Sequence, residues 1–376
     1  MRMTPHQILL AFLYFIILLV LLPIFSSNKV HSAYYQEKDK KEIKYIEKLK
    51  NDYRKDKVTE YLRITNQVES LQYHESNFKN NVDNLIIIIA KSPKDKEALI
   101  LSQLAAEIDL SLREKDFLTS ALVICNASRK DFNELEHLAE YYPVFQAYNT
   151  TQWKLFNSEE IIKHDFVECI GHAINHTSAK YITVIRDVIL PYSNFLPALT
   201  HIIRTKLSRS FSQGELVESP SWLYMHLHEP LTFRHFDLTI VCIVELFLIT
   251  CIGALLFYFT FRLIDPNLPH SYRVTYCFYG ALYFFTFSLV IGRPYINELR
   301  RLSYALYRVY DPPEPVHFSA MTLPSKNAAA LRMHLTGIMC SSYVPFHEVL
   351  DHFVNTMELP AFVVSPSLFR YVVDES

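Results

Sequence analysis

The sequence is poor in glycine, with only six glycines among 376 residues. They stand singly along the chain, at positions 171, 214, 253, 280, 292 and 337. A Walker A loop and a GxGxxG turn both need clustered glycines, because the backbone there must approach a phosphate closely. The sequence therefore excludes P-loop NTPases, classical dinucleotide-binding enzymes and protein kinases.

An excess of charge of one sign is also lacking, because 37 basic residues stand against 39 acidic ones and leave a net charge of −2. Proteins that bind nucleic acid along its phosphates carry a clear basic excess, so we expect no nucleic-acid partner. Half of the residues are hydrophobic and only 20% are charged. This composition excludes intrinsic disorder.

Three long apolar runs are present, at residues 8–25, 238–261 and 274–292, and the only charge within them is Glu245. A helix needs about 20 apolar residues to cross the hydrocarbon core of a membrane. Each run is therefore predicted to be a membrane span. For the first run a cleaved signal peptide is the alternative, but the run is long and no small-x-small cleavage site follows it, which favours an uncleaved signal anchor.

The loop at residues 262–273 holds two arginines and one acid, which favours the cytoplasmic side. The N-terminus is then cytoplasmic, and residues 26–237 and 293–376 share the opposite, lumenal side. Three N-x-S/T sequons, at Asn126, Asn149 and Asn175, all fall in the first lumenal segment. They are predicted glycosylation sites.

Six cysteines divide between the two environments. Three of them, at positions 242, 251 and 277, fall in the predicted spans, where cysteine behaves as a small apolar residue. Cys125, Cys169 and Cys340 fall in the lumenal parts, where an oxidising compartment permits one disulfide among them. The sequence leaves open which two of the three pair, and it has no CxxC motif.

Strand-like runs at residues 85–89, 121–125 and 181–185 alternate with helical patterns. This spacing is typical of a parallel sheet that is buried on both faces. Further candidate strands lie at 222–225, 316–323 and 361–364, on both sides of the second and third apolar runs. The simplest account is one α/β domain that a transmembrane helical hairpin splits in the sequence.

Residues 36–60 alternate charges around one apolar stripe, which predicts a solvated stem helix. The expected organisation is, in chain order, a cytoplasmic tail (1–7), a transmembrane anchor (8–25), a lumenal stem (26–80), the first part of the lumenal domain (81–237), a transmembrane helix (238–261), a cytoplasmic loop (262–273), a transmembrane helix (274–292) and the second part of the lumenal domain (293–376).

Asp187 directly follows the third strand-like run. Ligands of open parallel sheets bind at the carboxyl ends of the strands, so Asp187 is a candidate ligand or metal contact. A turn or a helix cap is the alternative role for an aspartate at this place.

Several segments have a recognisable pattern when taken together: GRPYINELRRLS at residues 292–303, Leu223-Tyr224 before the hairpin, 125–126, 142–144 and 181–191, and the tail from Cys340 through Leu368. In these segments the chain resembles the GPI N-acetylgalactosamine transferases, the post-GPI-attachment-to-proteins factor four family. The resemblance extends over most of the chain from about residue 80 onward.

The resemblance implies a multi-pass Golgi membrane enzyme with a GT-A-like domain in the lumen. Such enzymes transfer N-acetylgalactosamine from UDP-GalNAc to the glycan of GPI-anchored proteins, with a divalent metal, Mn²⁺ or Mg²⁺, held by an acidic triplet against the diphosphate. Here the matching residues are Arg186-Asp187-Val188. Asp187 is thus the implied metal contact, and Arg186 is a second group able to neutralise the diphosphate.

The tail also departs from the family pattern at the positions of its acid and base groups. His347, with Glu348 beside it, stands where an acidic residue is expected after Cys340, and Tyr371 replaces a histidine in the last strand. His347 and Glu348 are candidates for the general base. Two hypotheses follow: a UDP-sugar-dependent transferase, or a catalytically degenerate relative that binds GPI-anchored proteins or a Golgi partner.

Overall fold

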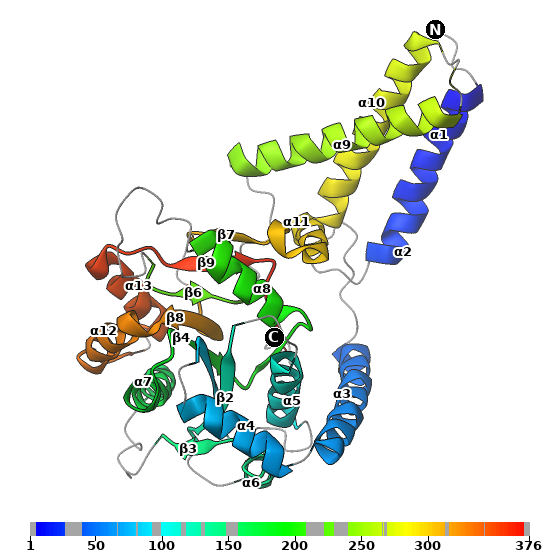
Figure 1. The fold of residues 1–376 in the computed structure, drawn as a ribbon. Coiled ribbons are helices and arrows are strands. Elements are labelled where there is room, and N and C mark those ends of the chain that lie inside the picture. The colour runs from blue at the N-terminus through cyan, green and yellow to red at the C-terminus, as the bar shows by residue number, and fades with distance from the viewer. Residues whose placement is uncertain are drawn as a thin grey trace. The chain divides into compact units, whose positions relative to one another are not determined.

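A computed structural model describes residues 5–26, 40–65, 67–79, 82–91, 99–113, 118–128, 132–147, 157–207, 222–228, 240–264, 266, 269–312, 316–341 and 343–371. The chain forms two compact units. One consists of Met1–Tyr45 and Leu231–Arg301, and the other of Ile46–Pro230 and Leu302–Ser376. The second unit contains all the strands of the described residues, and Figure 1 labels most of its elements.

The α/β unit is built on an eight-stranded sheet with the order β3-β2-β1-β4-β8-β6-β9-β7. Its strands are β1 (Asn84–Ala90), β2 (Ser120–Asn126), β3 (Val144–Gln146), β4 (Tyr181–Arg186), β6 (Met225–His226), β7 (Arg308–Tyr310), β8 (Ala320–Pro324) and β9 (Phe362–Ser365). A separate two-stranded sheet pairs β5 (Ile189–Pro191) with β10 (Phe369–Tyr371).

Strand direction divides the large sheet. The first four strands in its order, β3, β2, β1 and β4, run parallel, as do β6 and β9. In contrast, β8 is antiparallel to both β4 and β6, and β7 is antiparallel to β9. The parallel sheet expected from the sequence is thus confirmed for most of the strands, whereas β8 and β7 run antiparallel to their neighbours and make the sheet mixed. An apolar run in the sequence indicates that a strand is buried on both faces. It does not indicate in which direction the neighbouring strand runs.

Strands from distant parts of the sequence meet in this sheet. The central pair joins β4, which precedes the apolar helices, to β8, which follows them, with Ile182 opposite Leu323 and Val184 opposite Met321. Strand β6 lies between β8 and β9. The two stretches of chain that flank the apolar helices therefore form one folded body.

Helices cover both faces of the sheet, because alternate side chains of β1 point into two separate cores. Ile86 and Ile88 pack in one core, and Leu85, Ile87 and Ile89 in the other. The first core includes α5 (Ile100–Leu112), α6 (Asn133–Leu138), α8 (Phe195–His201) and the π-helical turn Ile202–Leu207. The second includes α7 (Ser158–His176), α12 (Ser325–Thr336) and α13 (Phe346–Met357). Figure 1 shows the resulting three layers.

The segment predicted to be a solvated stem consists of two helices, α3 (Lys40–Ile64) and α4 (Gln67–Lys79). Val58 and Leu62 of α3 belong to the first core, and His74 of α4 is fully buried. From residue 46 onward this segment is counted within the α/β unit. The helix expected at residues 36–60 is thus found as α3, and most of its described side chains lie at the surface, but Val58 and Leu62 pack on the domain instead of standing apart from it as part of a stem.

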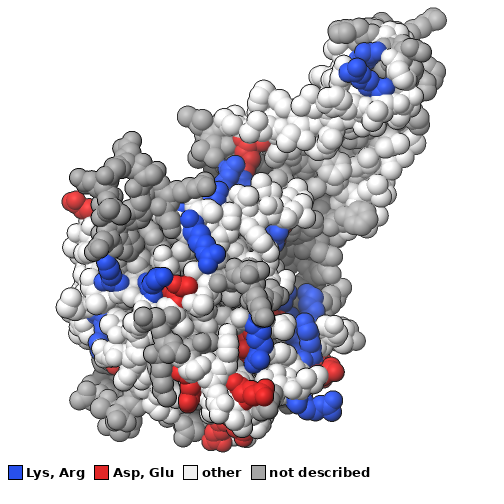
Figure 2. Space-filling view, viewed as in Figure 1, with Lys and Arg blue, Asp and Glu red and all other residues white. Residues whose placement is uncertain are grey.

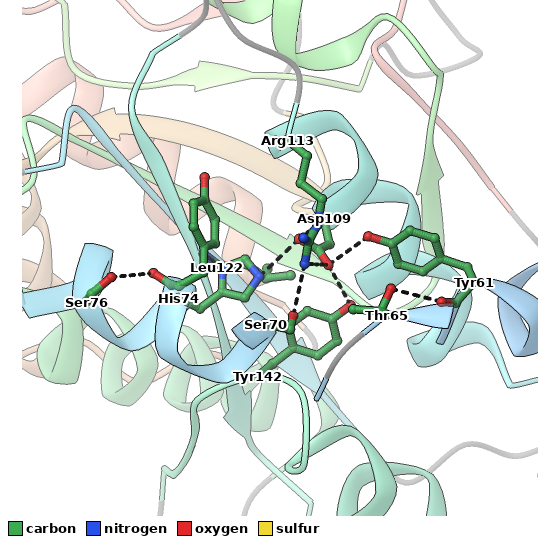
Figure 3. Close-up of polar contacts among 10 residues, drawn as sticks. Tyr61, Thr65, Ser70, His74, Ser76, Asp109, Arg113, Leu122 and Tyr142 are labelled. Carbon is green, nitrogen blue, oxygen red and sulfur yellow. Dashed lines mark hydrogen bonds and ion pairs between the residues drawn. The ribbon is translucent and has the colours of Figure 1, made fainter. Parts of the chain in front are cut away.

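A buried polar network joins these helices to the domain (Figure 3). Its centre is the carboxylate of Asp109 in α5, which has no exposed surface. The carboxylate accepts hydrogen bonds from the Tyr61 hydroxyl at 2.9 Å, the Tyr142 hydroxyl at 3.3 Å and the Arg113 guanidinium at 3.1 Å, and His74 Nε2 lies 3.1 Å away. Burial opposes the charge, but the bonds from His74 and Arg113 outweigh it and hold the pKa of Asp109 below its usual value.

The other unit is built of apolar helices. Helices α9 (Ile240–Ile264) and α10 (His270–Ile291) contain stretches, Ile243–Ile264 and Tyr272–Ile291, that are long and apolar enough to cross a membrane. The unit also holds α1 (Pro5–Ile16), the π-helical turn Ile17–Leu21, α2 (Leu22–Ser26) and α11 (Arg293–Asn297), with a shorter apolar stretch at Ala11–Ile24. The surface of α9 and α10 is almost wholly uncharged in Figure 2.

An ion pair compensates the charge of Glu245, the acid inside the second apolar run. Glu245 of α9 pairs with Arg300 from the 3₁₀ turn Glu298–Leu302 that follows α11. Both side chains are largely buried, at 11% and 14% exposure. Because the arginine compensates the carboxylate, Glu245 needs no transport or proton-relay role to explain it.

Helices α9 and α10 approach each other closely at two glycines. A Cβ on Gly280 would lie 2.5 Å from the carbonyl oxygen of Gly253 and 2.8 Å from the Phe257 side chain. Small residues let helix backbones meet in this way.

We expect Gly280→Ala to destabilise the helical hairpin by about 1–3 kcal/mol, because the added methyl group overlaps a backbone oxygen that cannot rotate away. The matched control is Gly337→Ala, where the new Cβ would meet its nearest atom at 3.6 Å. Thermal unfolding of the detergent-solubilised chain measures both variants. Equal unfolding temperatures for the two would contradict the close approach.

Candidate functional site

The site lies where β1 and β4 end. The two strands are parallel, with Ile89 opposite Arg186, so the residues that follow them, Lys91 and Asp187, emerge at the same edge of the sheet. A small pocket opens there. Its volume is about 210 Å³ including the space open to solvent, and it is lined by Ile89, Lys91, Ile162, Asp165, Arg186, Asp187 and Phe318. Ligands of open α/β sheets bind at this edge.

Lys91 makes two contacts that connect the acidic groups of the pocket. Its backbone N–H donates a hydrogen bond of 2.7 Å to Oδ2 of Asp187. Its ammonium group forms an ion pair with the carboxylate of Asp165 in α7. The side chain of Lys91 is 32% exposed, whereas that of Asp165 is only 3% exposed. The lysine therefore reaches from a buried anion toward solvent.

Asp187 is half-buried. Burial raises the pKa of its carboxyl group to about 6, although the hydrogen bond from the Lys91 amide and the charges of Arg186 and Lys91 oppose this rise. The carboxyl group is therefore much easier to protonate than an ordinary aspartate.

Arg186 is positioned by the chain that returns after the apolar helices. Its Nη1 donates to the carbonyl oxygen of Phe318 at 3.2 Å, and its backbone N–H donates to the carbonyl of Ser319 at 2.9 Å. Phe318 and Ser319 directly precede β8. The pocket is thus assembled from both parts of the α/β unit.

A disulfide holds α7 against the sheet. It joins Cys125 at the end of β2 to Cys169, one helical turn after Asp165. Of the three cysteines considered from the sequence, Cys340 is the one left free, and it is buried. Burial raises the pKa of the Cys340 thiol to about 11, so it is not a reactive thiolate.

His347 and Glu348 lie in the first turn of α13. The ring of His347 meets that of His317 edge-on, with centroids 4.1 Å apart. Burial and the neighbouring His317 lower the pKa of His347, so its ring is neutral at physiological pH. Glu348 is exposed, and its backbone N–H bonds to Pro345.

The structure brings these two residues near the pocket without joining them to it. His317, which contacts His347, directly precedes Phe318 of the pocket lining. Among the contacts of the described residues, none joins His347 or Glu348 to Asp187. A connection between the acid/base candidates and Asp187 therefore needs a bound substrate between them.

A divalent metal would find few ligands from the chain here. Among the described residues, no three or more His, Cys, Asp or Glu side chains are grouped to hold a metal ion. The two pocket carboxylates, Asp187 and Asp165, are both engaged by Lys91. The donor set of this pocket does not fit a metal, because the Lys91 ammonium pairs with one carboxylate and the Lys91 amide bonds to the other.

The three predicted glycosylation sites differ in exposure. Asn126 is 1% exposed, and its Oδ1 accepts a hydrogen bond of 2.9 Å from the Ser128 N–H. Asn175 is exposed near the end of α7. Asn149 lies outside the described residues. A glycan has no room at Asn126 in the folded domain, so that prediction is wrong.

Lys91 and Asp165 were missed from the sequence. Lys91 is the first residue after the apolar run that ends at Ala90, and the strand-end argument that selected Asp187 applies equally to it. Asp165 lies inside a helix, and no spacing in the sequence indicates that it faces the pocket. Strand β10 also returns to this edge, because Tyr371 pairs with Ile189, two residues after Asp187.

The chain was also compared with known protein families. The model of one family, described as GPI-N-acetylgalactosamine transferase PGAP4, matches residues 84–370. The matched region is more than half of the chain. It begins with β1, includes both long apolar helices and reaches β10.

Proposed function

The chain belongs to the GPI-N-acetylgalactosamine transferase PGAP4 family, and from that premise we propose that it is a membrane glycosyltransferase. It transfers N-acetylgalactosamine from UDP-GalNAc to the glycan core of GPI-anchored proteins. The observation that carries the proposal is the extent of the family match, because residues 84–370 include the pocket, the hairpin and the returning strands together.

The pocket supports this function through its position and charge. Arg186 and Lys91 offer a guanidinium and an ammonium group at the carboxyl edge of the sheet, and both cations suit a diphosphate. The pocket is small and partly open to solvent, so it cannot enclose a large ligand. The pocket accordingly takes the diphosphate end of the donor rather than the whole nucleotide sugar.

The acceptor hydroxyl needs a base. His347 is the proposed base, because its lowered pKa leaves an unprotonated ring nitrogen at physiological pH. Glu348 is the second candidate, although its side chain is exposed. The sugar is transferred when the acceptor oxygen attacks the anomeric carbon, its proton passes to the base, and UDP departs toward the cations of the pocket.

We place the protein in the Golgi membrane, with its N-terminus in the cytoplasm and the α/β unit in the lumen. Two helices of sufficient length and hydropathy support membrane insertion. The disulfide between Cys125 and Cys169 supports an oxidising compartment. A GPI-anchored acceptor remains at the membrane surface, so a catalytic domain tethered by its own hairpin suits that substrate.

Complementation tests the activity. The chain is expressed in cells that lack their own enzyme of this family, and GPI glycans are released and analysed by mass spectrometry. We expect an added N-acetylhexosamine on the glycan core. A chain expressed at normal level that adds no such sugar would remove the catalytic claim.

A second candidate function is binding without transfer. The observation that favours it is that Asp187 is the only acid in Arg186-Asp187-Val188 and is already bonded to the Lys91 amide. In that case the protein binds GPI-anchored proteins or a Golgi partner. Failed complementation together with co-purification of GPI-anchored proteins would favour this candidate.

Glycan mapping tests the lumenal placement. In an Asn149→Gln background, which removes the sequon outside the described residues, we expect Asn175→Gln to abolish a shift in electrophoretic mobility after endoglycosidase treatment. Asn126→Gln is the matched control and should leave the shift intact, because Asn126 is buried. No glycan at the exposed Asn175 would argue against a lumenal α/β unit.

A further inference from the structure

The charges around Asp187 differ from those that attract a divalent cation. A metal ion approaching the Asp187 carboxylate would meet two neighbouring cations, Lys91 and Arg186, and the other carboxylate among the described lining residues, Asp165, is paired with Lys91. Hard divalent ions need several oxygen ligands. Repulsion by the two cations and the small number of oxygen ligands together disfavour the binding of a divalent metal ion.

Lys91 is suited to the task that such a metal would perform. Its ammonium has three N–H donors. Asp165, at 3% exposure, is a buried partner that holds the ammonium in one place, while the side chain of Lys91 remains 32% exposed. The donors not used by Asp165 can bind phosphate oxygens. Arg186, anchored on the Phe318 carbonyl at 3.2 Å, supplies a second cation.

We propose that Lys91, oriented by Asp165 and assisted by Arg186, binds the donor diphosphate in place of a divalent metal ion, so that this chain binds its nucleotide without metal. The inference rests on the proposed function, since it presumes a UDP-linked donor. It assigns Lys91 as the phosphate-binding residue and Asp165 as its positioning residue.

Calorimetry of the full-length chain in detergent tests this, with UDP as the ligand, in EDTA and then in excess Mn²⁺. We expect the Kd for UDP to differ by less than about threefold between the two conditions. Tightening by more than that in Mn²⁺ would overturn the inference and leave the proposed function standing. Absence of UDP binding in both conditions would overturn the two together.

Substitutions identify the side chain that binds the diphosphate. Lys91→Met should weaken UDP binding in EDTA by about tenfold or more, which corresponds to the loss of one charged hydrogen bond. The matched control is Lys180→Met, which removes a lysine at the opposite edge of the sheet, where it pairs with Asp83. It should leave the Kd unchanged.

Loss of Lys91 alone leaves the Asp165 carboxylate buried and without its ammonium, which can cost stability. The double variant Lys91→Met/Asp165→Asn avoids that charge and should bind UDP as weakly as Lys91→Met. Lys91→Arg keeps a cation and should recover most of the affinity. Wild-type affinity in the double variant would overturn the assignment of Lys91.

Discussion

Asp187→Asn should reduce transfer of N-acetylgalactosamine by about 100-fold or more, because the Asp187 carboxylate interacts with the charges of Arg186 and Lys91 and helps to keep these two cations in place for the diphosphate. The amide oxygen can still accept the Lys91 N–H bond, so the local backbone is kept. Since burial raises the pKa of Asp187 to about 6, the fold disfavours its charge, and the neutral amide should not lower the unfolding temperature. Transfer assays and thermal unfolding of the same preparation measure both effects.

Asp83→Asn is the control for this experiment. Asp83 directly precedes β1, at the opposite edge of the sheet, and bonds to Lys180 at 2.7 Å. Its substitution removes a carboxylate from the same domain without touching the pocket. Full activity in Asp187→Asn, or an equal loss of activity in Asp83→Asn, would show that Asp187 is not part of the site.

Asp109→Ala should destabilise the α/β unit by about 3–5 kcal/mol, as expected when one partner of a buried charged network is removed. His74, Tyr61 and Tyr142 would lose a hydrogen-bond partner inside the protein. For a domain of this size the loss corresponds to a fall in unfolding temperature on the order of 10 °C. Differential scanning fluorimetry of the full chain measures it.

The control for Asp109→Ala lies on the same helix. Burial raises the pKa of Glu107, so its charge does not stabilise the fold and Glu107→Gln should leave the unfolding temperature unchanged or higher. The pKa of Asp109 is shifted in the opposite direction. Its pKa is lower folded than unfolded, so its contribution is present above the unfolded pKa and is lost as the pH falls through the folded value. Equal effects of the two substitutions would contradict the network.

The central strands could be predicted because their signal is local. The runs at 85–89, 121–125 and 181–185 are found in β1, β2 and β4, since each is apolar on both faces. The directions of β8 and β7 could not be predicted, because they depend on how the chain returns after the hairpin. Short strands such as β10, with three residues, carry too few side chains to form a pattern.

The site was predicted in part for the same reason. Asp187 follows a recognisable strand, so its position at the sheet edge could be inferred. Asp165 lies 74 positions after Lys91 and inside a helix, and only the folded chain shows that they meet. The network around Asp109 is similar, because His74 and Tyr142 come from separate stretches of sequence.

The order of strands has a consequence for how the protein is made. Strand β4 leaves the ribosome before β8, its neighbour in the sheet, and residues 187–319 are translated between them. At ~5–20 residues per second that interval is on the order of ten seconds. Throughout it the edge of β4 lacks its partner and can pair with other chains. Newly made copies should therefore depend on chaperones during this interval, and truncation before β8 should yield an aggregating fragment.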